Sequence, residues 1–177
     1  MQKAFLFLAA ILLSTALRAQ LPVDQERHHK VLMKNPYLRL LEGHVATNDT
    51  TPVHRHSANS VVIFLSKSTF GIQIPGDTPV LTTVKPGDFR YSPYGDKPVD
   101  HIVWNQTPGD FHFYVVEVAK KPVTRKLDSL DGQPLDLAAV PYPRLLIDAS
   151  IPTYRYFPPD TPLVWKKTAQ CILLEIR

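Results

Sequence analysis

The 177-residue chain is long enough for one domain, or for one domain and part of a second. Its 20 basic and 16 acidic residues are interleaved, which argues against nucleic acid as a partner. Proline is frequent, with 17 residues, and glycine is scarce, with 7. This composition favours many short strands over long helices.

The first 19 residues have the pattern of a signal peptide. Lys3 gives a basic start, an unbroken apolar run follows from Ala4 to Leu13, and small residues come after it. We expect cleavage after Ala19, with Ala16 as the alternative, and a secreted or periplasmic location. The run is too short to span a membrane, so we expect no stable membrane anchor once it is removed.

Residues 20–34 form a polar stretch that contains His28 and His29. Adjacent side chains point in different directions on either a helix or a strand. We therefore interpret this stretch as an N-terminal arm that docks on the next domain, and not as a pair of metal ligands.

Short strand-like segments alternate with turn signals between residues 35 and 119. The turns are marked by combinations such as Pro75-Gly76-Asp77 and Asn35-Pro36. The strands expected between the turns are 37–46, 61–65, 69–74, 80–84, 89–91, a segment with His101 and Trp104, and 111–119. Repeated strand pairs without a convincing helix predict an all-β antiparallel sandwich or barrel.

Residues 120–177 are expected to form a β-rich extension, with one helical turn around Arg125 to Leu130. Residues 141–146 weakly echo residues 36–41, and residues 173–176 echo 115–118, so a degenerate second repeat is one interpretation. No histidine occurs in this extension, so metal chemistry is expected within 35–119. The single cysteine, Cys171, lies in an apolar run and is expected to be buried.

A His-x-His pair comes shortly before the apolar β-branched run Val61 to Leu65. Because strand side chains alternate faces, His54 and His56 would point the same way and could reach one metal ion. Neutral imidazoles suit Zn, Fe, Ni or Cu. An isolated His-x-His pair is more often structural than metal-binding, so the prediction of a metal site also depends on a second motif.

Gly87, Pro93, Gly95, His101 and Asn105 follow the pattern Gly-x5-Pro-x-Gly, a spacer, and His-x3-Asn. This resembles the second conserved motif of the cupin family, although the spacer of five residues is longer than usual.

The stretch around His54 resembles the first cupin motif in part. Asn48 stands at the position of its opening glycine, and Asn tolerates positive φ better than most residues. The glutamate position falls on Ser60 or Val61, so the usual carboxylate is missing, and residues 66–68 replace the closing glycine.

The resemblance implies a small antiparallel β-barrel of jelly-roll type that holds a divalent metal ion through His54, His56 and His101. The resemblance does not distinguish Fe, Mn, Zn and Ni. It is compatible with a metal-dependent enzyme of the dioxygenase or isomerase type that acts on a small polar molecule, and it identifies no catalytic residue. The alternative is a metal-free cupin module that binds a small molecule or a protein.

Three further expectations concern two single residues and the assembly. His112 is interpreted as a structural histidine, with a fourth ligand or a general base as the alternatives. Asn105 is expected to close a turn through its side-chain amide. Exposed edge strands leave a homodimer as one option.

Overall fold

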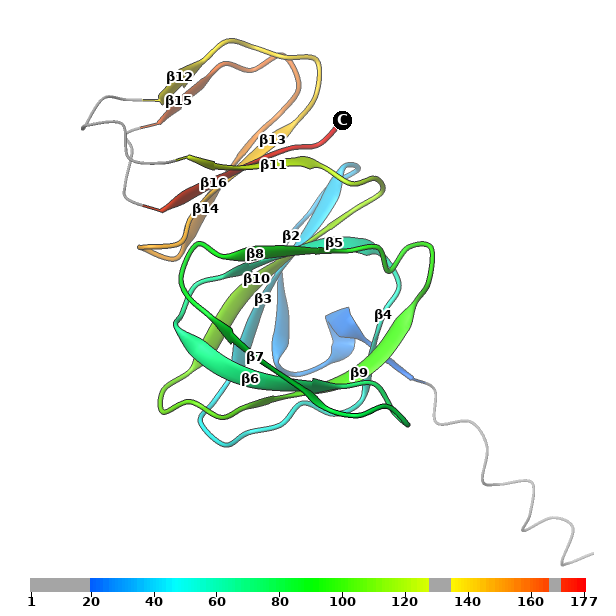
Figure 1. The fold of residues 1–177 in the computed structure, drawn as a ribbon. Coiled ribbons are helices and arrows are strands. Elements are labelled where there is room, and N and C mark those ends of the chain that lie inside the picture. Colours follow the sequence, from blue (N-terminus) through cyan, green and yellow to red (C-terminus); the bar gives the residue numbers. More distant parts are fainter. Residues whose placement is uncertain (1–19, 128–134, 166–169) are drawn as a thin grey trace, which may run out of the picture.

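The computed structural model describes residues 20–127, 135–165 and 170–177, and these residues form a β-barrel with a second β unit beside it (Figure 1). The expected signal peptide lies outside the described residues. The described part of the chain contains no helix with the length and apolar character needed to cross a membrane.

Two five-stranded sheets make the barrel. The first has the order β1-β4-β9-β6-β7 and the second the order β2-β3-β10-β5-β8. All barrel pairings are antiparallel except the parallel pair β1 and β4. Their bounds are β1 Leu21–Pro22, β2 His29–Lys34, β3 Leu38–Val45, β4 His54–His56, β5 Asn59–Phe64, β6 Ser68–Gln73, β7 Val80–Val84, β8 Phe89–Ser92, β9 Val99–Asn105 and β10 Phe111–Val118.

The antiparallel β architecture expected for residues 35–119 is confirmed, since each expected strand has its counterpart within a few residues. Alternation along the strands separates two apolar faces. Phe111, Phe113 and Val115 of β10 point into the barrel core, whereas Tyr114 and Val116 belong to a second core outside the barrel.

The prediction that residues 20–34 are a separate arm is wrong. They form β1, the 3-10 turn η2 (Val23–Gln25) and β2, and β1 and β2 each complete one edge of a barrel sheet. Figure 1 shows this first segment leading from β1, beside β4, to β2, beside β3. The error arose because charged residues interrupt the apolar pattern of β2, Lys30 and Lys34 among them.

The second unit is also all-β. Its four-stranded sheet has the order β11-β16-β13-β14, and a separate pair joins β12 to β15. Their bounds are β11 Val123–Leu127, β12 Leu135–Leu137, β13 Arg144–Asp148, β14 Thr153–Phe157, β15 Leu163–Trp165 and β16 Cys171–Glu175. The helical turn expected from Arg125 is wrong up to Leu127, where β11 runs, and its remainder lies outside the described residues. Cys171 is buried as expected.

The four-stranded sheet packs on the outer face of the barrel sheet that contains β3 and β10. One apolar cluster joins Leu40, Ile63 and Val116 of the barrel to Leu145 and Leu174 of the second unit. The neighbouring Leu146 points the other way, into a small core of the second unit. The β-rich extension is thus packed against the barrel through one face of its sheet.

The weak sequence echo corresponds to a repeated strand pairing. In the barrel, Arg39 of β3 is paired with Glu117 of β10. In the second unit, Arg144 of β13 is paired with Glu175 of β16, in the same antiparallel sense. The echoing residues therefore occupy equivalent register positions in two strand pairs.

Candidate functional site

The three histidines expected from the sequence lie together inside the barrel. β4 places His54 and His56 on the inner face, with exposed fractions of 0% and 4%. Arg55 between them points outward and forms an ion pair with Asp100 at 2.8 Å. β4 pairs with β9 so that His54 is opposite His101. The ring centroid of His101 lies 4.7 Å from that of His54 and 4.9 Å from that of His56.

A fourth histidine, His29, completes this cluster from β2. Its ring centroid is 5.0 Å from that of His54 and 5.8 Å from that of His56. Ligand nitrogens of His29, His54 and His56 all lie within 4.8 Å of one another. His29 is therefore buried in the cluster and does not lie on an arm outside the barrel, as the sequence interpretation of the His28 and His29 pair had it.

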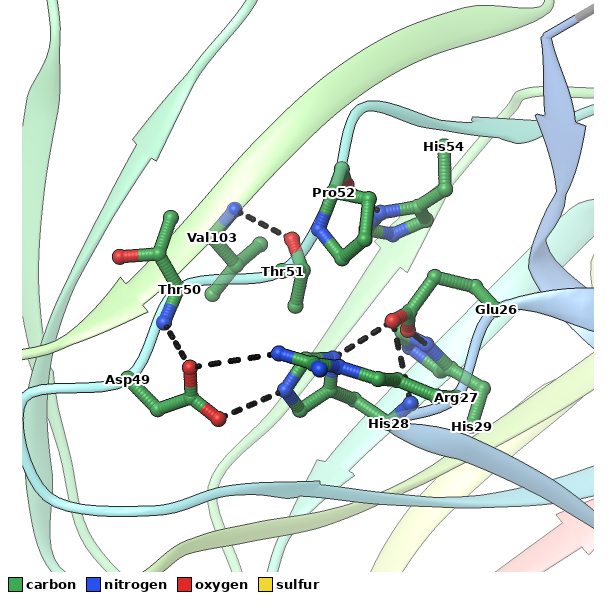
Figure 2. A network of polar contacts seen from close by, with 10 residues as sticks. All are labelled: Glu26, Arg27, His28, His29, Asp49, Thr50, Thr51, Pro52, His54 and Val103. Carbon is green, nitrogen blue, oxygen red and sulfur yellow. Dashed lines mark hydrogen bonds and ion pairs between the residues drawn. The ribbon is translucent and has the colours of Figure 1, made fainter.

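Glu26 orients His29 (Figure 2). One carboxylate oxygen accepts a hydrogen bond from His29 Nδ1 at 2.7 Å, and the other contacts His28 Nδ1 at 2.5 Å. The residue is only 1% exposed. Burial alone would raise the pKa of Glu26, but the hydrogen bonds from His29 and His28 outweigh burial and lower the pKa to about 2. Glu26 is therefore an ionised carboxylate directly behind the histidine cluster.

His28 links this carboxylate to the loop before β4. Its Nδ1 faces Glu26, and its Nε2 lies 2.9 Å from Asp49 Oδ2. Burial works to lower the pKa of His28, but the hydrogen bonds to Asp49 and Glu26 outweigh it and the pKa is raised. Both ring nitrogens therefore donate to carboxylates, and His28 fixes the position of Glu26 without entering the cluster.

The hydrogen bonds determine which nitrogens are left for a metal. The carbonyl of Pro52 accepts from His54 Nδ1 at 3.0 Å, so the lone pair of His54 is on Nε2. The bond to Glu26 likewise occupies His29 Nδ1 and leaves Nε2 as the nitrogen available to an ion. A metal ligand with its second nitrogen held in this way is the usual arrangement in metalloproteins.

Unpartnered polar atoms point to the same conclusion. Among the described residues, His54 Nε2, His56 Nδ1 and His101 Nδ1 are buried and have no hydrogen-bond partner. A buried polar atom without a partner costs free energy. The converging ligand nitrogens of His29, His54 and His56, with the ring of His101 beside them, fit a transition-metal ion, which would compensate that cost.

The imidazoles of His54, His56 and His101 are neutral at pH 7. Burial lowers the pKa of His54 to about 4 and that of His101 to about 3. Burial also holds the pKa of His56 well below its usual range. Each ring therefore keeps a lone pair for a metal without having to release a proton at neutral pH.

The same shifts predict acid sensitivity of the metal-free protein. The unfolded chain takes up protons on His54 and His101 near pH 6.5, and the folded chain only near pH 4 and pH 3. Stability is therefore full above pH 6.5 and falls as the pH drops from 6.5 toward 4. His54 alone contributes about 3 kcal/mol to this loss. Denaturant unfolding at pH 7 and pH 4.5, with a chelator present, measures this loss of stability. His54→Gln should reduce the dependence of the unfolding free energy on pH. Equal stability at both pH values contradicts the expectation.

The departures from the first cupin motif have clear structural positions. Asn48 has a φ of 60°, the conformation that its place as a glycine substitute requires. Ser60 is buried at the glutamate position on β5, opposite Glu117 of β10. Glu117 is engaged with Arg39. Among the described residues, the cluster at His29, His54 and His56 contains no carboxylate ligand.

The second motif is largely structural. Gly87 has a φ of 80°, and a Cβ on Gly95 would lie 2.9 Å from the Asn59 side chain. Asn105 donates to the carbonyls of Val45 and Gly109 and accepts from the Thr107 amide. The expected turn-closing role of Asn105 is confirmed.

His112 does not face the cluster. It shares the outer face of β10 with Tyr114 and Val116, and its Nε2 lies 3.0 Å from Glu42 Oε1. The alternatives in which His112 is a fourth ligand or a base in the barrel are therefore wrong.

The histidines line a cavity of about 70 Å³. His29, His56 and His101 line it together with mostly apolar side chains, among them Phe64, Phe70, Ile72, Val103, Phe111 and Phe113. Arg90 and Tyr94 lie where this cavity meets a neighbouring hollow, since both residues line both spaces. In the described part of the chain Arg90 is exposed and forms no ion pair.

Solved structures share this fold. A cupin 2 conserved barrel domain protein from Leptotrichia buccalis is 13% identical, with a TM-score of 0.50 over 95% of this chain and 94% of that chain. AerE from Microcystis aeruginosa is 9% identical, with a TM-score of 0.51 over 86% of this chain and 99% of that chain. A cupin domain from Bordetella pertussis Tohama I is 23% identical, with a TM-score of 0.47 over 57% of this chain and 98% of that chain. No protein-family model matches the sequence, and no curated protein matches it. At these identities the likeness concerns the fold.

Proposed function

Since the chain has the fold of the cupin proteins, we propose that it binds one divalent transition-metal ion inside the barrel. The proposed ligands are His54, His56 and His101, with His29 as a fourth. The observation that carries this proposal is the set of buried, unpartnered ring nitrogens on His54, His56 and His101, next to the converging ligand nitrogens of His29, His54 and His56. The glutamate of the first cupin motif is missing from this chain. Glu26 would supply a negative charge instead, through its hydrogen bond to His29 and not by direct contact with the ion.

We further propose that the site acts on a small molecule in the adjoining cavity, as a metal-dependent oxidoreductase or isomerase. A bound ion would supply Lewis-acid polarisation or redox chemistry. The chain itself would hold the imidazoles through Glu26 and Pro52 and exclude water with the phenylalanines of the cavity. The phenylalanine-rich lining favours a ligand with an apolar body. The sequence analysis expected a small polar molecule, and we propose that the polar group lies at one end of this ligand.

Arg90 is suited to hold that end. It lies at the cavity mouth and forms no ion pair with the described residues, so its guanidinium is available for an anionic group. We therefore propose a carboxylate or similar anion as the polar end of the ligand.

The ligand class can be tested with 3-phenylpropionate and the uncharged 3-phenylpropanol as probes. The metal-loaded protein should bind the acid more tightly than the alcohol, and Arg90→Gln should remove that preference, a change of about 10- to 150-fold for one charge-assisted hydrogen bond. Arg55→Gln, which changes an outward-facing arginine, is the control and should keep the preference. Equal binding of both probes by the unchanged protein would contradict the proposal.

Metal binding is tested by elemental analysis after loading and desalting. We expect the protein to retain one equivalent of metal in the barrel site and the His54→Ala variant to lose this equivalent. Arg55→Ala is the matched control, because it alters the next residue of β4 on the opposite face. A folded parent protein that retains no metal, yet still binds the small-molecule probes, would favour the non-catalytic binding module instead.

We also propose that the chain is exported. The basic start, the apolar run and the small residues before position 20 support this. N-terminal sequencing of the protein recovered from outside the cytoplasm should begin at Gln20, and a cytoplasmic protein that starts at Met1 would contradict it.

A further inference from the structure

A second group of metal-ligating side chains lies on the outer face of the barrel. His44 of β3 and His112 of β10 are directly opposite each other in the antiparallel pair, and Glu42 precedes His44 on the same face. The two imidazoles are stacked, with ring centroids 3.9 Å apart. Neither ring belongs to the cluster inside the barrel.

The donor atoms of these three residues already converge. Glu42 Oε1 lies 3.0 Å from His112 Nε2 and 3.6 Å from His44 Nε2. All three ligand atoms lie within 4.8 Å of one another. Ligands bound to one ion at about 2.0–2.1 Å in a tetrahedral arrangement are about 3.3 Å apart. The observed spacing therefore requires only small side-chain rotations.

The group is open to solvent on one side. The side chains of His44, Glu42 and His112 are 48%, 23% and 16% exposed. An ion could enter without opening the barrel, and water could fill its remaining coordination positions. The site is also independent of the barrel cluster, because Gly43 and Phe113, the residues next to His44 and His112, belong to the inner face.

We propose that Glu42, His44 and His112 form a second, surface-exposed site for a divalent ion such as Zn²⁺, Cu²⁺ or Ni²⁺. Two imidazoles and one carboxylate are a donor set that these ions favour. The carboxylate reduces the charge of the bound ion to +1, which lowers the cost of holding it at a partly covered surface. The ion would join β3 to β10 beside the sheet of the second unit.

The test is a calorimetric titration of metal-free protein, residues 20–177, with Zn²⁺. The proposal predicts that His44→Gln removes one equivalent of bound Zn²⁺ relative to the parent protein. His44→Gln should fold normally, because His44 is the most exposed of the three side chains. Glu42→Gln should weaken the same equivalent at least tenfold.

The comparison with His54→Ala separates this site from the one inside the barrel. His54→Ala should keep the equivalent that His44→Gln loses. If the parent protein binds a single equivalent that His44→Gln abolishes, the surface site holds and the barrel proposal fails. If His44→Gln binds as much Zn²⁺ as the parent protein with the same affinity, the surface site is refuted.

Discussion

Replacing Glu26 by glutamine is expected to weaken metal binding in the barrel by about 10- to 100-fold, the usual effect of losing a partner behind a metal ligand. Both oxygens of Glu26 are engaged by ring nitrogens, one from His29 and one from His28. The amide of glutamine has only one oxygen, so its NH₂ group would face one of these N–H donors. If that donor is His29, the ring must move its proton to Nε2 and lose the lone pair that the ion needs.

The measurement is a competition titration of the metal-loaded protein against a chelator of known affinity. Asp49→Asn is the matched control, since Asp49 contacts His28 on the side away from His29. It should change metal affinity much less than Glu26→Gln does. Similar losses in the two variants would mean that Glu26 acts through the position of the whole N-terminal segment and not through the His29 ring.

Removing residues 120–177 is expected to destroy the soluble monomer. The barrel face beneath the second unit carries Leu40, Val61, Ile63 and Val116, each fully buried. Burying one such side chain is worth about 1.5–3 kcal/mol. Exposing four of them would remove much of the ~5–15 kcal/mol that stabilises a typical domain and would leave a large apolar patch. Gel filtration and thermal unfolding of the shortened chain measure the effect.

A point substitution tests the same contact without a deletion. Leu145→Asp places a charge in the core between the two sheets, whereas Ile151→Asp alters a residue of the same unit that is 58% exposed. Only the first should lower the unfolding temperature markedly. A shortened barrel that stays monomeric with an unchanged midpoint would show that the second unit is not needed for the fold.

The sequence predicted the barrel because its signals are local. Strand alternation in residues 111–118 and turn combinations such as Lys85-Pro86-Gly87-Asp88 act within a few residues of each other. The positions of His54, His56 and His101 followed from the same local pattern and from the resemblance of two motifs.

His29 was missed because its role depends on tertiary structure. Its strand pairs with β3, and the preceding β1 pairs with β4, so the chain must pass from one barrel sheet to the other before His29 reaches His54. One local signal was available: Glu26 lies three residues before His29, within reach of its ring. A buried carboxylate and histidine at this spacing could have indicated an oriented ligand.

The second unit illustrates a similar limit. The echo between residues 36–41 and 141–146 was visible, and the repeated register of Arg39 with Glu117 and Arg144 with Glu175 gives it a structural meaning. Which face of β13 would pack on the barrel was not visible, because Leu145 and Leu146 are equally apolar. Only the packing of the two sheets distinguishes them.

A crystal structure of the metal-loaded protein, with diffraction data collected on both sides of the metal's absorption edge, tests the central claim most directly. The account predicts an anomalous peak inside the barrel, about 2.0–2.2 Å from ring nitrogens of His54, His56, His101 and His29. A fully loaded crystal without a peak among these four rings, or with a peak that His29 and His101 do not reach, would contradict it.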